Sequence, residues 1–245
     1  MTQLITRDIE YTAPDGTNLK GFFVAPPSTQ PLAGILLGPE WWGCNDFLIC
    51  RAKQLAEQGY AAFAMDMYGA QKATEDAEQA KQWMMETFEK PKTVVQRAQV
   101  ALNTLAEQPE VNPKQLAAIG FCYGGKVVLE LARTDAPLHV TASFHGNLTT
   151  NNPAQKGKFY GDVLICHGED DSMVSLDDVK TIDQELTHAE VPHQILILEH
   201  AKHGFTNPLA DERGQRNGVD LAYNSEATQK SFDALHALLK KKFDV

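Results

Sequence analysis

The chain has 245 residues, of which 43% are hydrophobic, and its formal net charge at pH 7 is −10. This length and apolar content are typical of one large α/β domain, and the acidity argues against nucleic acid or an anionic membrane as a partner. The N-terminus carries acids and no apolar segment, so we expect no signal peptide, and no apolar run approaches the length of a membrane span.

The first third of the chain predicts an antiparallel hairpin followed by a strand, a helix and another strand. The dipeptide Asp15-Gly16 is a hairpin turn signal. Residues 33–37 have the composition of a strand buried on both faces, and a loop rich in Pro, Trp and Gly follows at 38–46. The expected elements are strands over residues 5–11, 19–24, 33–37 and 60–65 and a helix over 47–58.

The middle of the chain is largely helical in pattern. Residues 74–108 predict helix with a break at Pro91, and residues 69–91 are a candidate flap or lid. The apolar side chains of this region either cover a substrate or pack the inner face of a helix. These side chains are Trp83, Met84, Met85 and Phe88.

From residue 115 onwards strands and helices alternate, which predicts a mostly parallel sheet with helices on both faces. Ser175 and Asp178 have the spacing of a capping box at the start of one helix. We expect a single domain over residues 1–245. The expected elements are strands over 115–121, 139–144, 163–167 and 194–198 and helices over 123–133, 176–186 and 223–242.

The predicted strand at 115–121 ends in a Gly-x-Cys-x-Gly motif centred on Cys122. At a junction of strand and helix, this motif has the form of a nucleophile elbow, with a thiol in place of the usual hydroxyl. Gly120 and Gly124 suit the close backbone contacts of such a turn. Cys122 would lie at the positive end of the next helix, which favours a thiolate. The alternative is that Cys122 is a small buried side chain, as free cysteines usually are.

The other cysteines, Cys44, Cys50 and Cys166, form no CxxC pair and are expected in or near the core. The cysteine content is too low for a disulfide scaffold. We therefore expect a cytoplasmic protein, since a reducing compartment would keep a nucleophilic thiol usable.

Four side chains follow predicted strands, where the active residues of open α/β sheets collect: Glu40, Cys122, Asp171 and His203. Nucleophile, acid and histidine occur in the order expected of an α/β-hydrolase. Cys122 would attack a carbonyl and form an acyl-enzyme, and His203 would transfer the proton. Asp171 would hold the imidazole in one tautomer and stabilise its charged form.

Backbone donors are needed for the oxyanion, and we expect them from the N–H groups of Trp41 and Tyr123. Trp42, His145 and Phe205 are candidate residues of the substrate pocket. For His145, the alternative is a hydrogen-bonded structural residue at the end of a strand.

Three alternatives concern the acid and base partners. Asp170 competes with Asp171 for the acid role, but the Gly-x-x-Asp-x-x-Val spacing favours Asp171. His200 and His203 could be a metal pair, but a third ligand is lacking nearby, and we expect neither a metal nor a cofactor. Glu40 either belongs to the site or caps the helix that begins near residue 47.

The motifs GFCYGG, GEDDSMV and HGF at 203–205 together resemble the dienelactone hydrolases, a thiol branch of the α/β-hydrolases. Glu40 with Gly43 and Asn45 matches that family's Glu-x-x-Gly-x-Asn loop. The resemblance covers nearly the whole chain and implies the α/β-hydrolase fold, with a mostly parallel central sheet and an N-terminal antiparallel hairpin. It also implies that Glu40 contacts the resting thiol and helps to ionise Cys122 when substrate binds.

We therefore expect a hydrolase of small carboxylic esters or lactones, acting as a monomer or homodimer. His203 is followed by Phe205, Thr206, Asn207 and Pro208, without the arginine that the family's dienelactone enzymes carry there. A general ester or lactone therefore fits as well as dienelactone. The alternatives are a catalytically silent scaffold that binds a small ligand, and the same fold acting on another electrophile such as a phosphoester.

Overall fold

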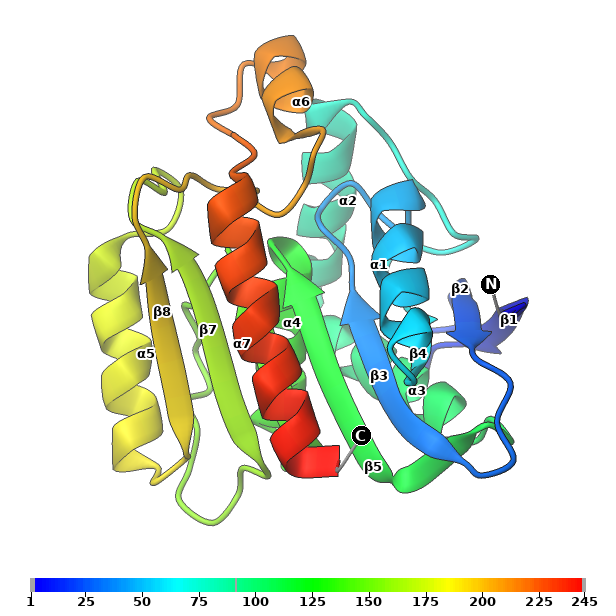
Figure 1. The fold of residues 1–245 in the computed structure, drawn as a ribbon. Coiled ribbons are helices and arrows are strands. Elements are labelled where there is room, and N and C mark those ends of the chain that lie inside the picture. Colours follow the sequence, from blue (N-terminus) through cyan, green and yellow to red (C-terminus); the bar gives the residue numbers. More distant parts are fainter. Residues whose placement is uncertain (1–2, 91, 244–245) are drawn as a thin grey trace. The chain divides into compact units, whose positions relative to one another are not determined.

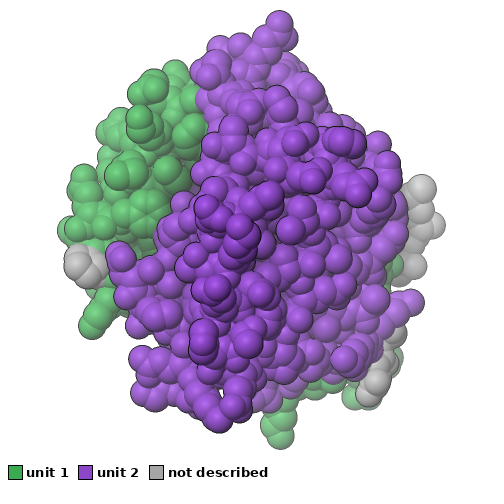
Figure 2. All heavy atoms as spheres, turned by 90° about the vertical axis from the view of Figure 1, so that its left-hand side faces the viewer, with its two compact units in different colours: residues 1–119 green, residues 120–245 purple. Residues whose placement is uncertain are grey.

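The computed structural model describes residues 3–90 and 92–243. The chain divides into two compact units, residues 1–119 and residues 120–245, which Figure 2 shows in different colours. The single domain expected over 1–245 stays a prediction. In the described residues, eight strands follow the order β1-β2-β4-β3-β5-β6-β7-β8, and β5 runs from the first unit into the second.

The first unit begins with the predicted hairpin of β1 (Ile5–Thr12) and β2 (Asn18–Ala25), which pair antiparallel. Gly16 in its turn has a φ of 84°, a conformation that glycine adopts without steric cost. β2 pairs antiparallel with β4 (Ala61–Ala64), and β4 pairs parallel with β3 (Leu32–Gly38). β3 is buried along nearly its whole length, as its apolar sequence predicts.

Helices cover the strands of the first unit. α1 (Asp46–Glu57) packs against β2, β3 and β4, and α3 (Thr93–Ala106) packs against β1 and β3. Figure 1 shows α1 in front of these strands and α3 behind them. Cys44 is buried as expected, but Cys50 on α1 is exposed, so the core position expected for Cys50 is wrong. Cys50 falls on a helix face turned toward solvent.

Two helices occupy the region expected to be helical over 74–108, and the interruption between them falls where the sequence predicts a break. α2 (Ala77–Glu89) ends before Pro91, which lies outside the described residues, and α3 begins after it. The ring of Trp83 on α2 lies 5.7 Å from the ring of Tyr68, whereas Met85 and Phe88 are exposed. The lid expected over 69–91 stays a prediction.

β5 (Val111–Phe121) is longer at its N-terminus than the expected strand. In the second unit, β6 (Leu138–Phe144), β7 (Asp162–Gly168) and β8 (His193–Leu198) are parallel, as the alternation of strands and helices predicts. Their carboxyl ends therefore lie at one edge of the sheet. Cys166 on β7 is buried, as expected.

α4 (Tyr123–Ala132) packs against β6, and α7 (Ser225–Phe243) packs against β6 and β7. Figure 1 shows α7 in front of these strands and α4 behind them. Among the described residues, none of the helices is both long and apolar enough to cross a membrane.

α5 (Leu176–His188) begins with the predicted capping box: the backbone N–H of Asp178 donates to Ser175 Oγ at 3.1 Å, and the N–H of Ser175 donates to Asp178 Oδ2 at 3.0 Å. The buried face of α5 joins one apolar cluster with β7. This cluster includes Val163, Ile165, Val179, Ile182 and Leu186.

Candidate active site

Cys122 lies on the sharp turn between β5 and α4, with a φ of 52° and a ψ of −114°. A positive φ is strained for a residue with a Cβ, and strain of this kind collects at functional sites. The N–H of Cys122 donates to the carbonyl of Phe144 at 3.0 Å, and the N–H of Gly125 donates to the carbonyl of Cys122 at 3.1 Å. The sequence predicts this strand–turn–helix geometry around the thiol.

Two glycines allow the turn to close. A Cβ on Gly120 would lie 2.0 Å from the carbonyl oxygen of Gly124, so no side chain fits there. A Cβ on Gly125 would lie 2.8 Å from the Cα of Gly146, which shows how closely α4 approaches the end of β6. The role of Gly120 was predicted, whereas that of Gly125 was not, because its contact depends on a segment some twenty residues away in the sequence.

Asp171 and His203 form a buried pair. Nδ1 of His203 lies 2.8 Å from Oδ2 of Asp171. The other carboxylate oxygen accepts the backbone N–H groups of Met173 at 2.8 Å and Val174 at 3.0 Å, which fixes its orientation. The structure therefore brings together the acid and the imidazole that the motif spacing selects.

Asp170 has a different environment from Asp171. Its side chain is 54% exposed, and its carboxylate lies 4.0 Å from Nδ1 of the exposed His200. Asp170 is therefore a solvated loop acid and not the partner of His203. Within residues 3–90 and 92–243, no group of three or more His, Cys, Asp or Glu side chains is arranged to hold a metal ion.

The electrostatics of His203 connect it to Cys122. Burial lowers the pKa of His203, but the charge of Cys122 and the hydrogen bond with Asp171 outweigh burial, so the pKa lies well above its ordinary value. Burial raises the pKa of Asp171, but its hydrogen bond with His203 and the charge of that imidazole leave it below its ordinary value. A protonated imidazole between a sulfur and a carboxylate can stabilise a thiolate and later protonate a leaving group.

His145, a candidate pocket residue, directly follows β6 and is fully buried, with a φ of 40°. Its ring centroid lies 5.3 Å from that of His203 and 5.0 Å from that of Phe205, another candidate pocket residue. Its Nε2 lies 2.8 Å from the hydroxyl of Thr206. His145 therefore contacts the candidate base, while a pocket role for either residue stays a prediction.

Glu40 lies on the loop between β3 and α1 and is buried. Its carbonyl accepts the N–H of Gly43 at 3.1 Å. The side chain of Asn45, not that of Glu40, caps α1 by accepting the N–H of Leu48 at 3.3 Å. The capping role considered for Glu40 is therefore wrong.

The loop that carries Glu40 is hydrogen-bonded to residues 68–74 within the first unit. The carbonyl of Trp41 accepts the hydroxyl of Tyr68 at 3.0 Å, and the carbonyl of Trp42 accepts the N–H of Thr74 at 3.0 Å. A Cβ on Gly43 would lie 2.1 Å from the carbonyl oxygen of Lys72. Trp42 is buried, and its ring packs edge-on against that of Trp41 at 4.9 Å.

Asp66 organises the segment that holds this loop, and its role was not predicted. The side chain is fully buried after β4 and accepts four backbone N–H groups at 2.8 to 3.1 Å. The donors are Lys20, Tyr68, Gly69 and Gln71.

Glu40 and Trp41 belong to the first unit, and the remaining candidate catalytic residues belong to the second. The expected contact between Glu40 and Cys122 stays a prediction. So does the pairing of the N–H groups of Trp41 and Tyr123 around an oxyanion.

α6 (Ala210–Asn217) was also not predicted and lies in the segment after His203. Leu209 precedes it without a side-chain cap, and Gly218 ends it with a φ of 65°. The helix carries two arginines: Arg213 is buried, and Arg216 is exposed and pairs with Glu212 at 2.5 Å.

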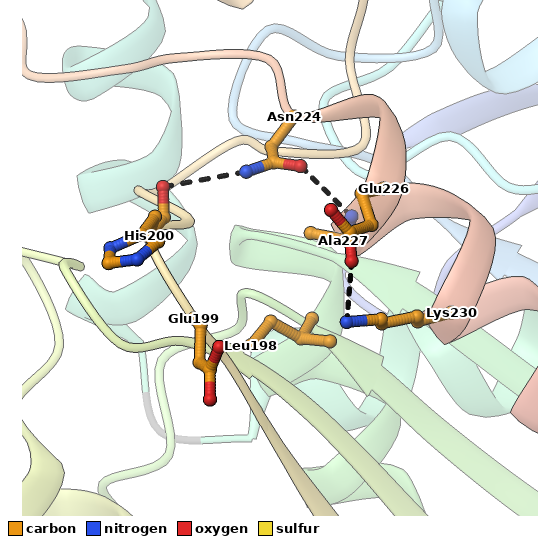
Figure 3. A pocket seen from close by; sticks show the side chains of 7 residues that line it. All are labelled: Leu198, Glu199, His200, Asn224, Glu226, Ala227 and Lys230. Atoms are coloured by element: carbon orange, nitrogen blue, oxygen red, sulfur yellow. Dashed lines mark hydrogen bonds and ion pairs between the residues drawn. The ribbon is translucent and has the colours of Figure 1, made fainter.

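A hollow of about 60 Å³ lies at the start of α7 (Figure 3). Asn224 caps the helix there by accepting the N–H of Ala227 at 3.0 Å, and Glu226 pairs with Lys230 at 2.7 Å. These polar groups have partners within the hollow, and none of the candidate catalytic side chains lines it. The lining residues are Leu198, Glu199, His200, Asn224, Glu226, Ala227 and Lys230.

Comparison with known proteins gives a consistent picture. The family model of the dienelactone hydrolase family matches residues 19–243. A putative carboxymethylenebutenolidase of Aquifex aeolicus is 30% identical over 208 residues, which are 81% of this chain and 86% of that protein. Another from Synechocystis is 26% identical over 236 residues, which are 91% of each chain.

Several solved structures also resemble this chain. A dienelactone hydrolase-like promiscuous phosphotriesterase from metagenomic libraries has a TM-score of 0.91 and 36% identity, covering 98% of this chain and 99% of that chain. An α/β-hydrolase from a deep-sea metagenome library has a TM-score of 0.71 and covers the same shares, but at 19% identity it shows the fold alone. The predicted fold, with its mostly parallel sheet and antiparallel hairpin, is confirmed.

Proposed function

This chain belongs to the dienelactone hydrolase family, and we propose that it hydrolyses small carboxylic esters or lactones through Cys122, His203 and Asp171. The observation that carries the proposal is the 2.8 Å hydrogen bond between the buried His203 and Asp171 side chains. This hydrogen bond would stabilise the protonated form of the His203 imidazole beside the sulfur of Cys122.

The reaction has two halves. The thiolate of Cys122 attacks the carbonyl carbon, a C–S bond forms, and the carbonyl electron pair moves to oxygen. When the pair returns, the C–O bond to the alcohol breaks, and His203 gives its proton to the leaving oxygen. Water then attacks the thioester while His203 accepts its proton, and the carboxylic acid leaves as the thiolate re-forms.

The remaining predicted residues have supporting roles. The N–H groups of Trp41 and Tyr123 stabilise the oxyanion, since donors fixed in advance cost no reorganisation during the reaction. Glu40 contacts the resting thiol and helps to ionise Cys122 when substrate binds. Trp42, His145 and Phe205 line the pocket.

The test is hydrolysis of p-nitrophenyl acetate by the wild type and by Cys122→Ala, with Cys50→Ala as the matched control. Cys50 is also a free cysteine, and it is exposed on α1. We expect turnover by the wild type and Cys50→Ala and none by Cys122→Ala. Turnover by Cys122→Ala would refute the mechanism. A wild type that binds esters without hydrolysing them would favour the silent scaffold.

A phosphotriester is a second candidate substrate. The observation that favours it is the 36% identity and TM-score of 0.91 to a protein described as a promiscuous phosphotriesterase. Paraoxon is the probe, and release of p-nitrophenol by the wild type but not by Cys122→Ala would support this activity. The absence of release at enzyme concentrations that hydrolyse the acetate would exclude it.

Thiol chemistry and net charge suggest the compartment and the partners of this enzyme. The cysteines of the described residues are free, which fits a cytoplasmic enzyme because that compartment keeps thiols reduced. The net charge of −10 fits a small-molecule substrate, not nucleic acid or an anionic membrane. The enzyme would act without a cofactor, as a monomer or homodimer.

A further inference from the structure

His145 connects the turn between β5 and α4, which carries Cys122 and is called here the nucleophile turn, to the segment that carries His203. Its own N–H donates to the carbonyl of Cys166 at 2.8 Å, and the residue before it, Phe144, accepts the N–H of Cys122 at 3.0 Å. The backbone at the end of β6 is therefore held by β7 on one side and holds the nucleophile turn on the other.

The side chain of His145 contacts three of the four residues from 203 to 206. Its ring packs edge-on against the rings of His203 at 5.3 Å and Phe205 at 5.0 Å, with interplanar angles of 66° and 80°. Its Nε2 lies 2.8 Å from the hydroxyl of the fully buried Thr206. One imidazole thus contacts both the ring of the base and two of the side chains that follow it.

We propose that His145 is a positioning residue that, together with the Thr206 hydroxyl, holds the imidazole of His203 between Asp171 and the sulfur of Cys122. This role rests on the proposed function and goes beyond it, because here His145 acts through His203, in addition to the pocket role proposed for it. The positive φ of 40° at His145 is consistent with it, since a strained conformation persists only where the surroundings impose it.

The hydrogen bond can be removed with little change of shape. Thr206→Val deletes the hydroxyl and keeps the volume, whereas Thr206→Ser keeps the hydroxyl. We expect Thr206→Val to lower kcat about tenfold at unchanged KM, because small displacements of a catalytic group are costly. We expect Thr206→Ser to retain wild-type turnover. His145→Ala removes the ring as well, and its expected loss is about a hundredfold.

A role shared by His145 and Thr206 predicts that the losses of kcat in the two single variants do not add in the double variant. If His145 and Thr206 act as one unit, the double variant His145→Ala/Thr206→Val loses no more than His145→Ala alone. His200→Ala is the matched control, since this histidine lies on the same loop with its side chain 86% exposed. It should keep the wild-type kcat.

A second readout does not need ester hydrolysis. The titratable neighbours of His203 are Cys122, Asp171, His167 and His145. We expect the pH profile for alkylation of Cys122 by iodoacetamide to move to higher pH in Thr206→Val and to stay in place in Thr206→Ser and His200→Ala. Circular dichroism would show that each variant is folded.

The two proposals can fail separately. If the wild type hydrolyses the ester and Cys122→Ala does not, but Thr206→Val matches the wild type in kcat and in its alkylation profile, the positioning role is overturned. If the wild type hydrolyses no ester but the alkylation profile still moves in Thr206→Val, the proposed function fails and the link from His145 to His203 stands. Additive losses in the double variant would also contradict the shared role.

Discussion

Nδ1 of His203 lies 2.8 Å from Oδ2 of Asp171, and both side chains are buried. The contact lowers the pKa of Asp171 and, together with the larger effect of the Cys122 charge, raises the pKa of His203, because opposite charges favour each other. Asp170, the neighbour in sequence, is half exposed and lacks this relationship.

Asp171→Asn should lower kcat for p-nitrophenyl acetate about a hundredfold or more, since the amide cannot stabilise the charged imidazole. Asp170→Asn, which removes a charge one residue away, should change kcat less than about twofold. Steady-state kinetics of both variants provide the measurement. Equal losses in the two variants would mean that Asp171 is not the acid partner.

The same pair predicts how stability depends on pH. The pKa of Asp171 is lowered in the folded protein, so its stabilising contribution exists above the unfolded value of about 4 and is lost as pH falls through the folded value. The pKa of His203 is raised, so its contribution exists below the unfolded value of about 6.5 and is lost as pH rises through the folded value.

Asp171→Asn should therefore be less stable than the wild type by about 3 kcal/mol between pH 5 and pH 6, where both contributions are present. The difference should shrink at alkaline pH as His203 loses its proton. Urea unfolding of both proteins across this range checks the prediction. A difference that grows with rising pH would contradict the assigned charges.

Tyr68→Phe isolates one contact of the loop that carries Trp41. The substitution removes only the hydroxyl that donates to the carbonyl of Trp41 at 3.0 Å. If the N–H of Trp41 stabilises the oxyanion, kcat should fall about fivefold at unchanged KM, because the loop is less well fixed. Tyr160→Phe, at an exposed tyrosine, is the control, and identical kinetics for both variants would argue against this role.

Gly120→Ala should be strongly destabilising, by about 3 kcal/mol or more, because its Cβ would lie 2.0 Å from the carbonyl oxygen of Gly124. Gly157→Ala is the matched control: nothing lies within 4 Å of its Cβ, and only its φ of 75° opposes the change. Gly157→Ala should lower the free energy of unfolding by about 1 kcal/mol. Thermal or urea unfolding distinguishes the two, and similar losses would mean that the clash at Gly120 is relieved.

The features predicted from sequence are those that local chemistry determines. The turn at Cys122 is bounded by an apolar strand and by glycines, and the Ser175–Asp178 capping box lies within four residues of sequence. Asp171 was distinguished from Asp170 by motif spacing alone, and its hydrogen bond with His203 agrees.

The features that were missed depend on distant segments or on weak local signals. α6 has eight residues and no side-chain cap at its start, so its sequence does not differ from a polar loop. The carboxylate of Asp66 accepts an N–H from Lys20, 46 residues earlier. The exposure of Cys50 depends on which face of α1 meets the strands, and its residue type does not reveal that face.

The central claim is that the sulfur of Cys122 becomes covalently acylated during turnover. Its most direct test is rapid quenching of the wild type with p-nitrophenyl acetate, followed by peptide mapping by mass spectrometry. We predict an acetyl group on Cys122 that accumulates in His203→Ala less than in the wild type and is absent from Cys122→Ala. Turnover without acylation of Cys122, or acetyl transfer to another residue at the rate of hydrolysis, would contradict the account.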